Sequence, residues 1–496
     1  MGRRLKFGII TSGPAEPVVR EVLQEGGLKD FVVVALPVPA ISLLTTSAIA
    51  SVLSSRRDLL SGLSDVDIVV LPGTVRGDAS EVAKVTGKPA FKGPRSLGEL
   101  PVTLKYVSQG ARLDTVKAAD EVLGSLTPSI SYEEAFRIGQ VPVPRRGPPV
   151  LLLSEVDPRA QDFAATARRY VEEGAQVIMV GAEDGMSLGE LRRRVREAKG
   201  LGLPVIAEAP SRAYAEEAIA AGADGLSVAD YQVPEVEDLL SRDLALLVGG
   251  DSLDRLRDVE RELAGRAKLI VDPSLAVPPL GLSQSVERYL RASRELSSPL
   301  LFSAANVTEE VEADTAGVHA VLALMAVEVR ASAYLVVEET YKSVHGTSEA
   351  REAIRLAESA YAARASERGM FSRLLVLKQD YPPPPQPQEE VSAEHVGYVE
   401  PQVSAGEYVR ISADPARGVM RVTLYRDGRA VGSLEGSHAL SLARALVRRF
   451  NVSAEHAAYI GYELSKAELS LKLGRTYVQD EPVIVTPWEK NGNSHC

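Results

Sequence analysis

The sequence predicts an α/β protein with three parts: a central (β/α)8 barrel, an N-terminal α/β layer domain and a small C-terminal α+β domain. Three observations lead to this prediction. Short apolar runs alternate with amphipathic stretches along most of the chain. Two proline-rich stretches interrupt the alternation. The length of 496 residues corresponds to about three domains of average size.

The composition narrows the class of protein. Apolar residues make up 45% of the chain and charged residues 25%, as in a packed globular protein. The net charge of −11 disfavours nucleic acid and membrane surfaces as partners, and no apolar run is long enough to span a bilayer. Because the one cysteine is Cys496, we expect no disulfide and no thiolate zinc cluster. We therefore expect a cytoplasmic protein, with a homo-oligomer left open. Its scarce cysteine and asparagine favour a thermophilic source.

The N-terminal α/β domain is predicted over residues 1–147. Apolar, β-branched runs at 7–10, 31–36 and 68–71 each end at a turn signal and are separated by helical stretches. Such runs are typical of a parallel sheet that is covered on both faces. The domain ends in the proline-rich stretch 141–149, which cannot continue a helix or a central strand.

The barrel is predicted over residues 148–380. Eight strands, each followed by a helix, match the TIM (β/α)8 barrel in number and in length. An open, doubly wound sheet is the alternative, but it would normally have fewer strands. The predicted strands are 150–154, 177–180, 205–207, 225–228, 244–248, 268–271, 300–304 and 334–337.

A proline-rich linker is predicted at 381–390, and it leads into a C-terminal α+β domain at 391–496. Strands are expected at 407–412, 419–425 and 430–435, with two helices after them. Because short turns join these strands, they should pair as an antiparallel meander.

Acidic and polar residues follow the barrel strands. Since the active site of such a barrel lies at the carboxyl ends of its strands, these residues are candidates for binding a substrate. Some of them could instead cap helices. Buried carboxylates need a partner or a ligand, which favours the functional interpretation for those at the strand ends. The predicted substrate-binding residues are Glu155, Glu183, Glu208, Asp230, Asp272, Asn306, Glu338 and Ser348.

A ring of carboxylates has two natural uses. It can hold a divalent metal such as Mg²⁺, or it can accept hydrogen bonds from a ligand rich in N–H groups, such as an aminopyrimidine or a pterin. Asn306 adds a mixed donor and acceptor, with an Asx turn as the alternative. Lys342 and the helix start near Ser348 form a loop typical of phosphate sites, with a helix cap as the alternative. Lys342 and Asn306 are therefore the predicted catalytic residues. The chain lacks a GxGxxG motif, and neither NAD nor haem is expected.

Several segments resemble known proteins. Four of them are similar to the pterin-binding barrel of dihydropteroate synthase, and others are similar to the archaeal dihydropteroate synthase-related proteins. The first group is 173–183, 203–208, 221–227 and 269–274; the second is 71–73 with 77–78, 92–94, 306–309 with 312–318, 337–339 with Lys342, 456–464 and 477–480.

The resemblance implies a barrel that binds a pterin. Asp272 stands at the aspartate position of the synthase's sixth strand, and Glu208 stands where the synthase has an aspartate on its third strand. Other positions differ from the synthase: Ser227 replaces an asparagine, and Glu338 and Glu339 replace an arginine–histidine pair. Pterin recognition is thus better preserved than the pyrophosphate and aminobenzoate sites.

The implied activity is that of a transferase in folate or methanopterin biosynthesis. Such an enzyme joins a hydroxymethyldihydropterin pyrophosphate to an aminobenzoate-type acceptor. A pterin-dependent methyltransferase and a non-catalytic pterin-binding scaffold are the alternatives.

Overall fold

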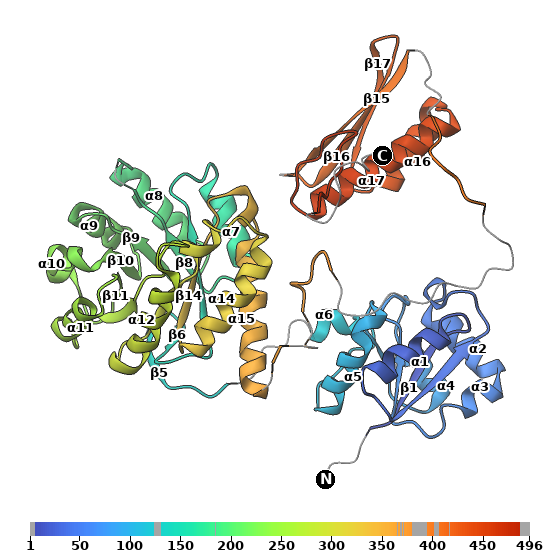
Figure 1. Cartoon of the computed structure of the whole chain (residues 1–496), viewed down its shortest axis with the longest axis horizontal. Helices are drawn as coiled ribbons and strands as arrows, with labels where there is room; N and C mark the ends of the chain where they lie inside the picture. Colours follow the sequence, from blue (N-terminus) through green and yellow to red (C-terminus); the bar gives the residue numbers. More distant parts are fainter. Residues whose placement is uncertain are drawn as a thin grey trace. The chain divides into compact units, whose positions relative to one another are not determined.

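The computed structural model describes residues 5–123, 130–183, 185–364, 366–367, 370, 372–378, 394–400, 406–415 and 417–486. It contains two compact units, residues 1–387 and 388–496, which are described separately below (Figure 1). The predicted linker at 381–390 lies outside the described residues. The domain limits at 147 and 380 stay predictions.

The N-terminal part is a four-stranded parallel sheet in the order β2-β1-β3-β4. Separate apolar clusters cover its two faces, which confirms the predicted α/β layer. The fourth strand was missed by the sequence pattern because it has only three residues and ends in a lysine. The strands are β1 (Phe7–Ser12), β2 (Phe31–Leu36), β3 (Ile68–Leu71) and β4 (Ala90–Lys92); the helices are α1 (Glu16–Glu25), α2 (Thr46–Ser55), α3 (Arg57–Ser61), α4 (Ser80–Thr86), α5 (Leu100–Ser108) and α6 (Ala119–Leu123).

Eight parallel strands form the predicted barrel, in the order β12-β11-β10-β9-β8-β7-β14-β13. A parallel bridge between Val271 and Leu300 joins the two ends of this order and closes the barrel. Helices surround the strands (Figure 1). The strands are β7 (Leu151–Val156), β8 (Val177–Val180), β9 (Val205–Glu208), β10 (Gly225–Ala229), β11 (Ala245–Gly249), β12 (Lys268–Asp272), β13 (Leu301–Ser303) and β14 (Ala333–Val337). The helices are α7 (Phe163–Glu172), α8 (Leu188–Lys199), α9 (Arg212–Ala221), α10 (Val233–Val236), α11 (Leu253–Glu262), α12 (Leu282–Glu295), α13 (Ala305–Thr308), α14 (Thr315–Glu328) and α15 (Gly346–Ala363).

Side chains alternate between the barrel interior and the helix layer, as the pleat of a strand requires. Leu151 and Leu153 of β7 pack in the interior with Met179 and Ile206, whereas Leu152 packs against the helices. The same alternation applies to the other strands, so the direction of each side chain follows from its position along its strand.

A β-hairpin closes the amino-terminal end of the barrel. It consists of β5 (Glu134–Ile138) and β6 (Val141–Pro144), which pair antiparallel. Ile138 and Val143 pack in the same interior cluster as the first residues of the barrel strands. The hairpin therefore belongs to the barrel core, although it precedes residue 147 in the chain.

The C-terminal unit contains the predicted antiparallel meander and two helices. Its strands pair in the order β15-β16-β17, and both helices pack on one face of the sheet. The elements are β15 (Glu407–Asp414), β16 (Val419–Arg426), β17 (Arg429–Gly436), α16 (Ala439–Phe450) and α17 (Ala454–Lys472).

The segment after α17 is fastened to the edge of this sheet. The Gln479 side chain accepts a hydrogen bond from the Ile411 N–H at 2.9 Å and donates to the Val409 carbonyl at 3.2 Å. Buried Glu463 of α17 accepts a hydrogen bond from the Tyr477 hydroxyl at 2.6 Å. These polar side chains thus hold the C-terminal unit together. Within the described part of the chain, no helix has the length and apolar character needed to cross a membrane.

The hairpin gives a prediction about stability. Ile138 is 1% exposed, so Ile138→Ala should leave a cavity and lower the free energy of unfolding of the barrel by about 2–5 kcal/mol. Urea denaturation followed by circular dichroism measures this change. Gln140→Ala, in the exposed turn of the same hairpin, is the control and should change stability by less than about 0.5 kcal/mol. Equal stability of the two variants would contradict the role of the hairpin.

Candidate functional site

The carboxyl end of the barrel carries one layer of inward-facing residues. Because inward and outward side chains alternate, the last inward position of each strand follows from the interior cluster below it. This layer contains three acidic residues separated by small ones. Its members are Glu155, Gly181, Glu208, Ser227, Gly249, Asp272, Ser303 and Val337. The structure therefore brings together three of the predicted residues: Glu155, Glu208 and Asp272.

Glu155 and Glu208 meet across the end of β8. A Cβ atom on Gly181 would lie 2.8 Å from Oε1 of Glu155, so the absence of a side chain lets this carboxylate lie over β8. The next residue, Ala182, donates its N–H to Oε2 of Glu208 at 3.0 Å. The two carboxylates thus flank a single peptide group.

This arrangement disfavours the ionised form of Glu155. Burial raises its pKa to about 8, and the negative charges of Glu208, Asp157 and Glu339 add to the effect. Burial also raises the pKa of Glu208, against the hydrogen bond from Ala182. Among the described residues, neither glutamate takes part in an ion pair. The pair is therefore short of hydrogen-bond donors.

Asp272 is buried, and hydrogen bonds from other protein groups occupy most of the acceptor positions of its carboxylate. Its Oδ1 accepts hydrogen bonds from the Tyr289 hydroxyl at 2.5 Å and from the Ser274 N–H at 2.8 Å, while Oδ2 accepts from the Ser303 hydroxyl. Burial raises the pKa of Asp272, and these three donors oppose the rise. Asp272 is thus a fixed acceptor in the layer.

Five of the predicted residues lie outside the inner layer, and three of these are Glu183, Asp230 and Asn306. Glu183 is exposed beyond the end of β8. Asp230 follows β10 and lies close to Gly250, where a Cβ atom would be 2.7 Å from its Oδ2. Asn306 is exposed on α13 and donates to the Leu275 carbonyl at 2.9 Å. Because the chain turns into a helix directly after β13, Asn306 is not at the tip of a strand.

Glu338 faces the helix layer, because it continues the outward positions Tyr334 and Val336 of β14. Its carboxylate forms an ion pair with Arg169 of α7 at 2.7 Å. It also accepts hydrogen bonds from the N–H groups of His345 and Thr347, each at 3.2 Å. Glu338 therefore occupies the N-terminus of α15.

In the predicted phosphate loop, the Lys342 side chain contacts groups of the protein where a phosphate was expected. Lys342 donates from Nζ to the Val311 carbonyl at 2.8 Å and lies 3.6 Å from Glu312. Ser348 is exposed in the first turn of α15. The structure thus separates these two residues from the inner carboxylates.

The sequence reasoning missed the partners of Asp272. Ser303 and Gly249 could have been found from the two-residue alternation along β13 and β11, because both occupy inward positions. Tyr289 gave no such signal, because it comes from α12 and its hydroxyl reaches Asp272 only once that helix has packed on the barrel.

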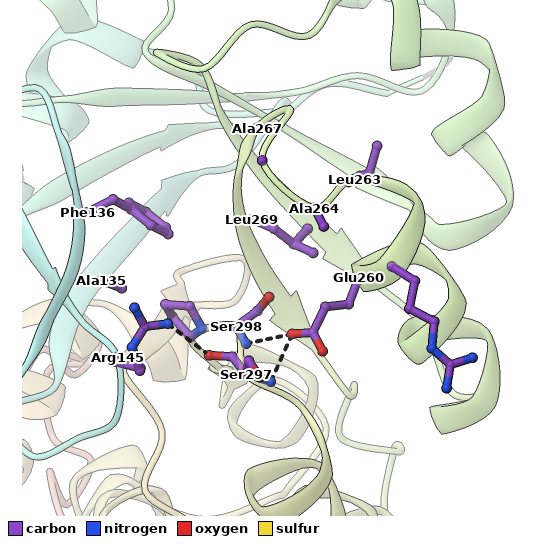
Figure 2. A pocket seen from close by; sticks show the side chains of 13 residues that line it. Ala135, Phe136, Arg145, Glu260, Leu263, Ala264, Ala267, Leu269, Ser297 and Ser298 are labelled. Atoms are coloured by element: carbon purple, nitrogen blue, oxygen red, sulfur yellow. Dashed lines mark hydrogen bonds between the residues drawn. The ribbon is translucent and has the colours of Figure 1, made fainter.

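Over the described residues, no group of three or more His, Cys, Asp or Glu side chains is placed to hold a metal ion, and the Mg²⁺ alternative stays a prediction. A cavity of about 380 Å³ lies at the amino-terminal end of the barrel, where Phe136 of the hairpin and Leu269 of β12 form its apolar wall (Figure 2). Its polar side holds Glu260, which accepts hydrogen bonds from the N–H groups of Ser297 and Ser298. This cavity is separate from the layer of carboxylates.

The raised pKa of Glu155 predicts a dependence of stability on pH. Its contribution to stability is full below the ordinary pKa of 4.5 and is lost as the pH rises through about 8. Glu155→Gln removes this loss, so the melting temperature of the wild type should fall relative to the variant between these pH values. Differential scanning calorimetry at several pH values measures it. The exposed Glu172→Gln is the control, and its curve should run parallel to that of the wild type. Parallel curves for Glu155→Gln would contradict the prediction.

Comparison with known proteins shows what this chain is similar to. Residues 389–480 match the family model PterinBD-DUF4346. An uncharacterized protein of Methanocaldococcus jannaschii is 24% identical, covering 96% of this chain and 98% of the relative.

Among solved structures, the dihydropteroate synthase of Yersinia pestis with a pterine–sulfa conjugate is similar over 47% of this chain and 100% of its own, at 15% identity and a TM-score of 0.37. The dihydropteroate synthase of Thermus thermophilus is similar over 43% of this chain and 94% of its own, at 23% identity and a TM-score of 0.34. The match over residues 389–480 confirms the predicted resemblance to the pterin-binding, dihydropteroate synthase-like family.

Proposed function

We propose that the barrel binds a pterin at its inner layer of carboxylates. The observation that supports this most directly is the convergence of Glu155, Glu208 and Asp272 at the carboxyl end of the barrel. None of the three takes part in an ion pair among the described residues. Buried carboxylates need hydrogen-bond donors, and the aminopyrimidine edge of a pterin supplies adjacent N–H groups without adding a metal.

The small residues of the layer support a planar ligand. Ser227 and Gly249 come from the strands between Glu208 and Asp272, and neither has a bulky side chain. A flat ring placed over these positions would have one carboxylate on each side. The interior apolar cluster, including Ile206 and Leu247, lies directly below.

The reaction that we propose is the one implied by the resemblance: transfer of the pterin methylene from pyrophosphate to an aminobenzoate-type acceptor. The acceptor amine forms a bond to the methylene carbon as the bond to the pyrophosphate oxygen breaks, and the amine then loses a proton. The chain would contribute orientation and charge stabilisation, with the inner carboxylates orienting the ring.

One observation favours a second candidate, a pterin-dependent methyl transfer. The N-terminus of α15, where a leaving pyrophosphate was expected to bind, holds the Glu338 carboxylate instead. In a methyl transfer, the methyl group passes from the pterin to an acceptor, and the demethylated pterin leaves without release of such an anion. The second candidate therefore needs no anion site at this helix.

A binding measurement tests the proposal. Isothermal titration of the full chain with 6-hydroxymethyl-7,8-dihydropterin should show binding, and Glu208→Gln should weaken it by about tenfold or more, because a charged acceptor is lost. Glu172→Gln, which alters an exposed carboxylate of α7, should bind like the wild type. Absence of binding, or equal affinity of Glu208→Gln and the wild type, would rule out the proposed site.

A second experiment separates the reactions. The pterin pyrophosphate with 4-aminobenzoate should give pyrophosphate release, whereas a methyl-bearing tetrahydropterin, supplied together with a reduced corrinoid as the methyl acceptor, should lose its methyl group only if the second candidate is correct. Pyrophosphate and the demethylated pterin are both measured by liquid chromatography. Ligand binding with neither product would instead indicate a non-catalytic scaffold.

A further inference from the structure

The cavity at the amino-terminal end of the barrel lies apart from the proposed pterin site. It lies between the hairpin and the last turn of α11 (Figure 2). Its volume of about 380 Å³ falls within the range of about 300–1000 Å³ that is usual for small-molecule sites. Phe136, Leu263 and Leu269 form an apolar wall. The cavity is therefore suited to a small ligand with an apolar part.

Glu260 of α11 lines this cavity with a carboxylate of which only one oxygen is used. Its Oε1 accepts hydrogen bonds from the N–H of Ser297 at 2.9 Å and from the N–H of Ser298 at 2.6 Å. Among the described residues, Oε2 has no hydrogen-bond partner. Because an ionised carboxylate accepts on both of its oxygens, Oε2 can take an N–H donor from a ligand.

Arg145, which follows β6, lines the same cavity with a guanidinium that is also partly used. Its Nε donates to the exposed Glu133 at 2.6 Å, and its Nη1 donates to the Ser297 carbonyl at 3.4 Å. In the part of the chain that the structure describes, Nη2 has no acceptor. The N–H groups of Nη2 can therefore bind a carboxylate of a ligand.

Glu260 and Arg145 already bind the two polar groups of a single residue. The N–H of Ser297 donates to Glu260, and its carbonyl accepts from Arg145 (Figure 2). In a free α-amino acid, the ammonium and the carboxylate flank one Cα atom as the N–H and the carbonyl do in Ser297. The unused atoms, Oε2 and Nη2, belong to the same two side chains. Their spacing thus suits the ammonium and the carboxylate of one amino acid.

The segment that carries Ser297 is held in place without a ligand. Arg146 donates hydrogen bonds to the carbonyls of Leu296 and Ser298, the second at 2.6 Å. Glu260 takes N–H groups of the same segment. Because these contacts exist already, a ligand would not have to order this side of the cavity on binding.

We propose that this cavity binds a free apolar α-amino acid in its zwitterionic form. The ammonium donates to Oε2 of Glu260, the carboxylate accepts from Nη2 of Arg145, and the side chain lies against Phe136 and Leu269. No pterin takes part, so this inference does not depend on the proposed function.

The first test compares ligands on the unchanged full chain by isothermal titration. L-phenylalanine or L-leucine should bind at one site per chain. Phenethylamine lacks the carboxylate, 3-phenylpropionate lacks the ammonium and glycine lacks the apolar side chain, so each should bind at least about tenfold more weakly than L-phenylalanine. If neither L-phenylalanine nor L-leucine binds, or if phenethylamine binds as tightly as L-phenylalanine, the proposal is wrong.

The second test assigns the two charged groups. Glu260→Gln keeps an oxygen for Ser297 and Ser298 but loses the acceptor at Oε2, so L-phenylalanine should bind about tenfold more weakly. Its affinity for 3-phenylpropionate, which has no ammonium, should not change. Arg145→Gln should weaken both ligands. Glu262→Gln removes an exposed carboxylate of α11 and should bind like the wild type. Equal affinity of Glu260→Gln and the wild type for L-phenylalanine would contradict the assignment.

The place of binding is measured by hydrogen exchange and mass spectrometry. L-phenylalanine should slow the exchange of amides in the hairpin at 134–144 and in the segment 296–299. The amides at the carboxyl ends of β9 and β12 should exchange as before. Slower exchange at those strand ends alone would put the amino acid at the other end of the barrel and overturn the proposal.

Discussion

The alternation of side chains along the barrel strands is the constraint on which the site depends. Each strand directs successive residues to opposite faces, so the interior packing of Leu153, Met179 and Ile206 decides which residues above them point inward. A shift of β7 by one residue would move Glu155 into the helix layer and bring Leu152 inside. The positions of the inner carboxylates are thus set by the apolar core and not by the acidic residues themselves.

Three acidic side chains at this end of the barrel are stabilised in three different ways. Asp272 receives three hydrogen bonds from fixed donors. Glu338 is paired with Arg169 and with the N–H groups of α15. Glu155 has acidic neighbours, and burial raises its pKa, which disfavours its charged form. Asp272 and Glu155 keep hydrogen-bonding groups that face the mouth of the barrel, whereas Glu338 uses its hydrogen-bonding groups within the protein.

The eight barrel strands could be predicted to within a few residues, because each is a short apolar run bounded by turn signals. The predicted site was less complete, since it relied on position after a strand and ignored the face of the sheet. Glu208 ends β9 and Glu338 follows β14, but the first side chain is inward and the second is outward. Asn306 could not be placed because α13 begins immediately after β13. Tyr289 depends on how α12 packs, which is a tertiary property that a local pattern does not contain.

The Gln479 side chain has a consequence for assembly of the C-terminal unit. It occupies the N–H of Ile411 and the carbonyl of Val409, which are backbone groups at the free edge of β15. An extended segment from another molecule would have to displace this amide before it could pair there. The cover of this edge therefore disfavours growth of the sheet by addition of a strand beside β15.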